Sequence, residues 1–173
     1  MAKTVVGKIY QANFYINGNT FLGQAKEFSI PTIENNMEDF VSVGLPGSIS
    51  LASGKNSIES RVAWNAPNKI AWRYAADTET TYDFMIKGGR EDYTTGNTTV
   101  MENITCFMRG RFRQTPNLDY TGKADATSET AIDVYSLKVE IDGVSYLEYD
   151  PLAYIYTVNG IDKLAAMRIA LGL

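Results

Sequence analysis

The clearest indication of the fold lies in residues 131–149, AIDVYSLKVEIDGVSYLEY. Side chains in residues 131–141 alternate in a way that is typical of a long β-strand with two distinct faces. The pair Asp142-Gly143 then predicts a tight turn, because Asp-Gly suits the left-handed backbone of a two-residue hairpin turn. Residues 144–149 follow as the return strand. One face of the first strand is predicted to carry Ala131, Asp133, Tyr135, Leu137, Val139 and Ile141.

A second hairpin is predicted near the beginning of the chain. Residues 9–16 (IYQANFYI) are rich in β-formers and lead into Asn17-Gly18, after which residues 20–30 (TFLGQAKEFSI) supply the return strand. An Asn-Gly pair between two such runs is a strong hairpin signal. Further strands are predicted at 48–52, 58–64, 82–88, 98–114 and 152–158.

Two of these strands carry more specific signals. In 58–64 the alternation predicts one buried face, made by Ile58, Ser60, Val62 and Trp64. The strand 98–114 is long enough to bend, and Gly110 within it is a candidate β-bulge.

Two short helices complete the expected elements. The segment 66–77 has Asn65 as a candidate N-cap and an early proline, and residues 159–173 carry an apolar stripe that Gly172 ends. Antiparallel hairpins without alternating helices imply a mainly β fold: an antiparallel β-barrel or sandwich with one flanking α-helix and a short C-terminal helix. A chain of 173 residues is predicted to fold as a single domain, 1–173.

Residues 31–47 (PTIENNMEDFVSVGLPG) show neither the helical nor the strand period and are predicted to form a long loop. Loops of this length in a compact domain are usually functional, and in this chain the function would be contact with another molecule. The alternative is a loop that folds over its own domain. The residues expected to make contacts are Ile33, Glu34, Glu38, Asp39, Phe40 and Leu45.

The composition argues against catalysis. The chain has no histidine, which removes the commonest general base and metal ligand. Its one cysteine, Cys106, lies in an apolar stretch and is predicted to be buried. The carboxylate pairs Glu38-Asp39 and Glu91-Asp92 are expected in solvated loops, where nothing would raise their pKa values. No catalytic residue, cofactor site or metal site is therefore expected.

Charge and hydropathy narrow the possible partners. A net charge of −4 and a pI near 4.9 disfavour tight nucleic-acid binding, and no run is apolar and long enough for a membrane span. The sequence shows no secretory signal, so synthesis in a cytoplasm is expected. Arg109, Arg111 and Arg113 share one strand face by their spacing; a charged face that pairs with acidic neighbours or a partner subunit is favoured over a phosphate track.

Both ends of the chain resemble one family. Residues 137–173 are similar to the C-terminus of major tail tube proteins from contractile-tailed phages and R-type bacteriocins, above all in NGID at 159–162, Leu164-Ala165, Arg168 and LGL at 171–173. Residues 15–51 resemble the hairpin, proline and acidic loop of that family. Leu45-Pro46 stands where the family has a glycine-methionine pair, and in 57–125 only the order of elements agrees.

The resemblance implies a structural subunit that forms hexameric rings. The rings would stack into the inner tube of a contractile particle, and residues 31–47 are the candidate stacking loop. Implied partners are further copies of the chain, the tail sheath subunit and a baseplate or tail initiator, with DNA passing through the lumen without specific binding. The implied location is the virion tail, assembled in the host bacterial cytoplasm.

Two alternatives remain open at this point. One is the tube of a headless R-type bacteriocin, which the sequence does not separate from a phage tube. The other is a β-sandwich module that binds carbohydrate, suggested by the eleven tyrosines. A carboxylate-based hydrolase is a weaker third.

Overall fold

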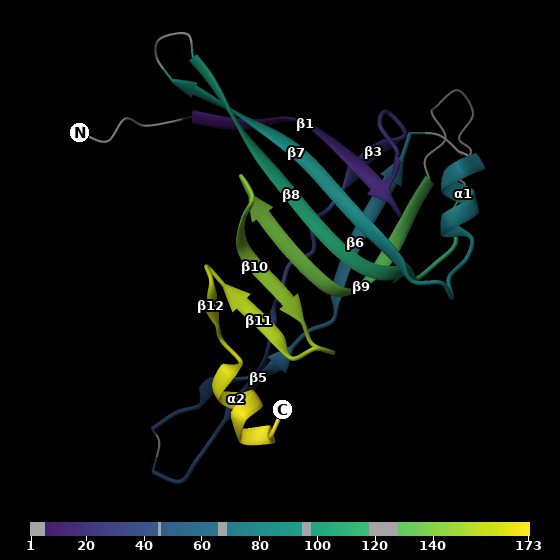
Figure 1. Cartoon of the computed structure of the whole chain (residues 1–173). Helices are drawn as coiled ribbons and strands as arrows, with labels where there is room; N and C mark the ends of the chain where they lie inside the picture. Colours follow the sequence, from purple (N-terminus) through teal and green to yellow (C-terminus); the bar gives the residue numbers. More distant parts are fainter. Residues whose placement is uncertain (1–5, 45, 66–68, 95–97, 118–127) are drawn as a thin grey trace.

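The computed structural model describes residues 6–44, 46–65, 69–94, 98–117 and 128–173. Within these ranges the chain is mainly β, as predicted, and contains two short helices (Figure 1). The strands are β1 (Val6–Ile16), β2 (Asn19–Thr20), β3 (Ala25–Phe28), β4 (Asn35–Phe40), β5 (Ile49–Lys55), β6 (Ile58–Trp64), β7 (Tyr82–Thr94), β8 (Thr98–Phe112), β9 (Ser128–Ile141), β10 (Val144–Asp150), β11 (Ile155–Val158) and β12 (Ile161–Asp162). The helices are α1 (Lys69–Ala75) and α2 (Ala165–Leu171).

One large antiparallel sheet organises the molecule. Its strands follow the order β12-β11-β10-β9-β8-β7-β1-β2, and β6 joins it at β9, with β3 paired to β6. Strands β4 and β5 form a separate two-stranded sheet. The hydrogen-bonded order of the described strands has open ends and does not close into a barrel.

The long strand β9 is where the sheet divides. Residues 128–134 pair with β6, whereas residues 137–141 pair with β10 on that same edge. Along its other edge β9 pairs with β8, and the register shifts where Arg109 faces Ser136 but Gly110 faces Val134. Tyr135 is thus the extra residue of a β-bulge, which bends the strand. The predicted bulge at Gly110 is confirmed, with the additional residue on the partner strand.

The bulge also corrects the predicted face of residues 131–141. Before it, the buried side chains are Ile132 and Val134; after it, the buried side chain is Leu137. A bulge adds one residue and so reverses the alternation. The prediction that one set of alternate residues shares a single face along the whole strand is therefore wrong.

Aromatic side chains fill the core where the sheet folds over itself. Phe14 of β1 stacks on Phe84 of β7 within its layer and on Phe28 of β3 across the core, with ring centroids 5.9 and 6.0 Å apart. Trp64 of β6 packs edge-on to Phe14 and donates its indole N–H to Thr130 Oγ1 at 3.1 Å. The arrangement is that of a sandwich, with β1 and β7 facing β3 and β6.

Several strand predictions agree with the structure. Ile58, Ser60, Val62 and Trp64 are all buried on one face of β6, as their alternation predicts. Both hairpin turns form, since Asn17-Gly18 and Asp142-Gly143 each have positive φ at both residues. The first hairpin is shorter than predicted, because only Asn19–Thr20 returns along β1 and β3 leaves to pair with β6. Glu91 and Asp92 belong to β7, so their predicted loop placement is wrong.

The helices differ from prediction mainly in length. Helix α1 buries Ala71 and Ala75 against the core, while the side chain of Asn65 donates to the Gly23 carbonyl, four residues before the helix begins. Residues 159–164 form a turn and β12 instead of helix, and α2 covers only Ala165–Leu171. It ends at Gly172 in the left-handed conformation, as predicted. Neither helix in the described part of the chain is long and apolar enough to cross a membrane.

Candidate assembly surfaces

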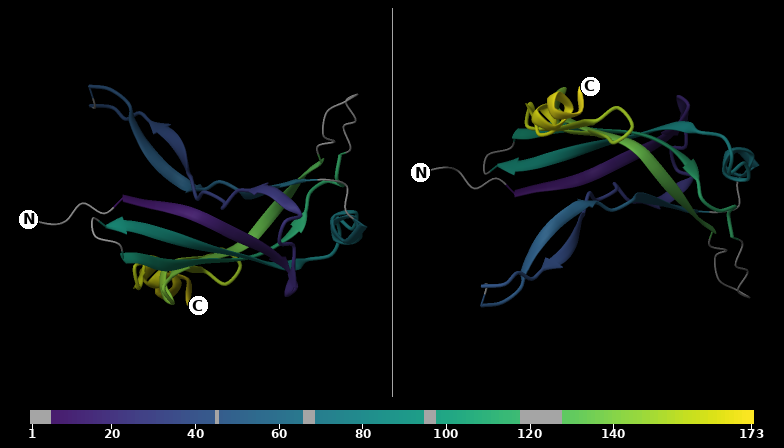
Figure 2. Two further views of the ribbon diagram at one scale, coloured as in Figure 1. Left: turned by 90° about the horizontal axis from the view of Figure 1, so that it is seen from above. Right: turned by 90° about the horizontal axis from the view of Figure 1, so that it is seen from below.

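Strands β4 and β5 form a hairpin that projects away from the large sheet (Figure 2). The prediction of a structureless loop over residues 31–47 is wrong for Asn35–Phe40, which pair with Ile49–Lys55. Side chains reinforce the base of this hairpin: Lys55 Nζ donates to Asn35 Oδ1 at 2.6 Å, and Asn36 Nδ2 to Ser53 Oγ at 3.0 Å. The sequence NNMEDF does not alternate between apolar and polar residues, because both faces of this strand are exposed to solvent and neither needs to be apolar.

The hairpin register sorts its side chains into two faces. Glu38 lies opposite Leu51, and Phe40 lies opposite Ile49, so these four residues share one face. We call this set, Glu38, Phe40, Ile49 and Leu51, the hairpin face. Asp39 points to the other side, as does Met37.

Apolar side chains on the hairpin are open to solvent. Phe40, Ile49 and Leu51 are 47%, 46% and 48% exposed, and Val41 and Val43 beyond them are more exposed still. Large exposed apolar groups concentrated on one projection are typical of a contact surface. These exposed side chains fit the contact role predicted for residues 31–47, and that role stays a prediction.

The predicted contact residues therefore divide into three groups. Glu38, Asp39 and Phe40 are on the exposed strand β4, and Glu34 is exposed just before it. Ile33 packs half-buried against the core and anchors the hairpin instead of projecting with it. Leu45 lies outside the described residues. Met37, Ile49 and Leu51 were missed, because their role depends on the pairing of β4 with β5.

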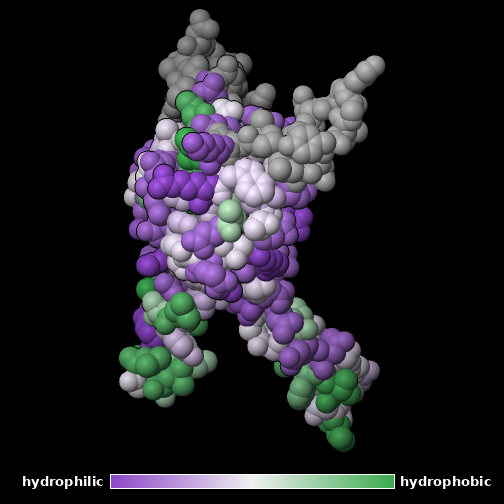
Figure 3. Space-filling model, turned by 90° about the vertical axis from the view of Figure 1, so that its right-hand side faces the viewer, coloured by the Kyte–Doolittle hydropathy of each residue, from purple (hydrophilic) through white to green (hydrophobic). Residues whose placement is uncertain are grey.

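A second projection is formed by α2 and β12. In Figure 1 it lies at the same end of the molecule as the β4–β5 hairpin, and Figure 3 shows two projections there with apolar tips. Helix α2 has no buried residue, and four apolar side chains of this region are more than half exposed: Ile161, Met167, Ile169 and Leu171. Of the predicted apolar stripe, Leu164 and Ala165 are half-buried, whereas Ile161, Met167 and Leu171 are more than half exposed.

Polar bonds connect α2, which has no fully buried residue, to the chain that precedes it. The Arg168 guanidinium pairs with the Asp162 carboxylate and donates to the Tyr154 carbonyl at 2.8 Å. Asp162 also accepts the backbone N–H of Leu164 at 2.9 Å. The hydrogen bond from Arg168, together with that from Leu164, lowers the pKa of Asp162.

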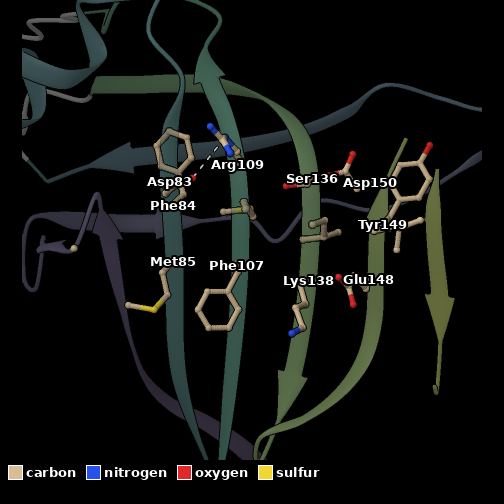
Figure 4. A pocket seen from close by; sticks show the side chains of 14 residues that line it. Asp83, Phe84, Met85, Phe107, Arg109, Ser136, Lys138, Glu148, Tyr149 and Asp150 are labelled. Atoms are coloured by element: carbon tan, nitrogen blue, oxygen red, sulfur yellow. Dashed lines mark ion pairs between the residues drawn. The ribbon is translucent and has the colours of Figure 1, made fainter. Parts of the chain in front are cut away.

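Arg109 and Arg111 of β8 and Arg113, which directly follows this strand, are all exposed, in agreement with their spacing. Arg113 binds Glu59 and Asp133 at 2.7 and 2.5 Å, and these hydrogen bonds raise its pKa. Arg109 lies 3.8 Å from Asp83, at the edge of a groove of about 570 Å³ between β7 and β11 (Figure 4). Arg111 has no ion pair within the described part of the chain.

The described residues hold no catalytic assembly. Cys106 is fully buried, and burial raises the pKa of its thiol to about 12, so it is not a nucleophile near neutral pH. No group of three or more potential metal ligands occurs among these residues. The exposed apolar side chains of the two projections suit contact with another molecule.

Comparison with known proteins agrees with such a role. The model of the family described as phage tail tube protein FII matches residues 7–172. The chain belongs to this family. It is also 25% identical over 170 residues to the tail tube protein of Escherichia phage P2, covering 96% of this chain and 97% of that protein.

Membership in the phage tail tube family settles the class of function. Tail tube proteins of this family are structural, so the chain is a structural component of a phage tail and not an enzyme. Between the tube subunit and the carbohydrate-binding module, the comparisons favour the tube subunit. The exposed apolar projections of this tail tube protein are its candidate sites of assembly.

Proposed function

We propose that this tail tube protein forms hexameric rings that stack into the inner tube of a contractile tail, through which DNA leaves the particle. The single observation that carries the proposal beyond the family is the β4–β5 hairpin, which projects from the sheet with its apolar side chains exposed. An isolated two-stranded hairpin is only marginally stable in water. Contact with another copy would supply the apolar burial that the hairpin lacks.

The geometry favours the hairpin as the stacking element. A contact between two different surfaces of identical subunits repeats either around a closed ring or along an open filament. The hairpin and α2 extend from one end of the molecule, so they form a directional surface suited to the next ring. Glu34, Glu38, Asp39 and Phe40 remain the proposed contacts of the originally predicted set.

Replacing residues 36–53 by a short Gly-Ser turn tests this role. The variant is expected to remain folded and to form rings, but electron microscopy and sedimentation should show no tubes. A finer variant, F40S/L51S, keeps the hairpin backbone and removes two of its exposed apolar groups. Leu22→Ser is the matched control, because Leu22 is an exposed apolar residue outside the hairpin. Tubes of normal length from the replacement variant would refute the stacking role.

The remaining expected partners follow from the tube proposal. The outer wall would contact the tail sheath subunit, and a baseplate or tail initiator would nucleate the first ring. Arg109, Arg111 and Arg113 are proposed to form a charged contact face between subunits. The same tube would serve a headless R-type bacteriocin, and capsid and terminase genes beside this gene would favour the phage.

A further inference from the structure

The division of the sheet at β9 creates a groove. Strand β6 begins at Ile58 and β10 ends at Asp150, and both pair with the same edge of β9, so a notch opens beside the bend. The groove has a volume of about 560 Å³. We call it the Arg111 groove; the residues used to define it are Lys55, Ile58, Arg111, Tyr135, Tyr149 and Leu152.

The floor of the Arg111 groove is apolar and its rim is basic. Ile58 and Tyr149 are largely buried at its base, while Leu152 at the rim is 84% exposed. Three cations, Lys55, Arg111 and Arg113, line it against the single carboxylate of Asp133. In a chain of net charge −4 this is a local excess of positive charge.

Only one of the three cations lacks a polar partner in the described part of the chain. Arg113 is paired with Glu59 and Asp133, and Lys55 donates to Asn35 while lying 4.6 Å from the centre of the Tyr156 ring. Arg111 makes no hydrogen bond or ion pair there. Its guanidinium is therefore available to bind a carboxylate in two-pronged fashion.

The hairpin face has the complementary chemistry. It presents three exposed apolar side chains, Phe40, Ile49 and Leu51, beside one carboxylate, Glu38. Residues 31–54 contain three acidic residues and no lysine or arginine. The hairpin is acidic and apolar, and the groove has a basic rim and an apolar floor. The two surfaces are therefore complementary both in charge and in hydrophobicity.

We propose that the hairpin face of one copy occupies the Arg111 groove of a second copy, with Glu38 bound to Arg111. The inference rests on the proposed stacking function and names the surface that receives the hairpin. The groove lies at the root of its own hairpin, since Lys55 ends β5 and lines the groove. Hairpin and groove are two different surfaces, so each copy would bind the next head to tail instead of closing a symmetric pair, as stacking requires.

Charge reversal tests the pairing. Arg111→Glu places a carboxylate against Glu38, and we expect the critical concentration for tube formation to rise about tenfold or more, because like charges in contact oppose association. The double variant R111E/E38R restores the pair with inverted polarity and should recover most of the tube yield. Arg73→Glu makes the same charge change at an exposed position on α1 and should assemble normally.

The outcomes separate this inference from the proposed function. Normal tubes from Arg111→Glu would overturn the groove assignment while leaving the hairpin replacement free to confirm stacking. Loss of tubes in Arg111→Glu without recovery in the double variant would overturn the pairing of Glu38 with Arg111. Unmodified protein that forms neither rings nor tubes, even with a tail initiator present, would instead refute the proposed function.

Discussion

Gly110 lies where β8 approaches β9 too closely for any side chain. A Cβ atom at this position would stand 2.1 Å from the backbone oxygen of Asp133, which is far inside van der Waals contact. The sequence indicates the bulge through a glycine inside a long strand, since such glycines often mark close backbone approach. It does not indicate that Tyr135, on the other strand, is the additional residue.

Gly110→Ala is expected to destabilise the fold by about 1–3 kcal/mol, because the backbone of β8 or β9 must shift to admit the methyl group. Urea unfolding followed by the fluorescence of Trp64, which is buried in the core, measures the change. Gly89→Ala is the matched control on the neighbouring strand β7, where a Cβ would meet nothing within 4 Å. Equal stability of the two variants would contradict the close approach.

Arg168 and Asp162 belong to the C-terminal motif, and the structure shows what they do there. The sequence singles out both residues only by resemblance to a family. The structure supplies the reason, because their ion pair fastens a helix that buries no side chain. Conversely, no residue-level signal identifies Arg111 as the arginine that has no partner among the described residues, since that depends on where Glu59 and Asp133 lie.

At the scale of elements, the attachment of α2 is expected to depend on pH. The folded-state pKa of Asp162 is lowered from its ordinary value of 3.8, so the pair stabilises the attached helix above that value. The contribution is lost as the pH falls through the lowered folded-state pKa. Amide hydrogen exchange in residues 165–171, corrected for the intrinsic pH dependence of exchange, should then accelerate.

Asp162→Asn should give that accelerated exchange already at pH 7, because the amide cannot replace the ion pair. Exchange in β7 and β8 serves as the internal reference, since the bonds of the pair named above join residues between 154 and 168, which lie outside both strands. Unchanged protection of residues 165–171 in this variant would show that α2 is held by other contacts.

The hairpin illustrates how pairing overrides local pattern. Residues 48–52 are recognisable as a strand from their own composition, whereas NNMEDF at 35–40 contains few residues that favour β structure. It becomes β4 because β5 lies within hydrogen-bonding distance across the tip of the hairpin. Only that register reveals that Glu38, Phe40, Ile49 and Leu51 share one face.

At the scale of the whole molecule, net charge bears on the proposed conduit. Six copies of a chain with net charge −4 would carry −24 per ring. Duplex DNA binds proteins largely by releasing counterions from phosphates that contact lysine and arginine, so an acidic ring should retain it poorly.

Assembled tubes are therefore expected to leave short duplex DNA unbound at low salt. A gel-shift or filter-binding titration at about 50 mM salt measures this, a concentration at which phosphate contacts are strong. A polyarginine-tagged variant of the protein provides the positive control for detection. Retention of DNA that weakens steeply as salt increases would contradict a non-adhesive wall.

The sequence by itself determined the mainly β class, both hairpin turns, the buried face of β6, the bulge at Gly110 and the absence of histidine chemistry. These features depend on neighbours along the chain: alternation sets a strand's faces, and Asn-Gly or Asp-Gly sets a turn. Its end motifs also led to the correct family.

Tertiary structure alone decided the division of the sheet at β9, the reversal of its buried face and the pairing of β4 with β5. It also decided that Arg111 has no partner within the described part of the chain. Each depends on which strands meet across long stretches of chain. Strand pairing depends on how all the apolar side chains of the core are buried together. A local pattern of residues therefore does not predict it.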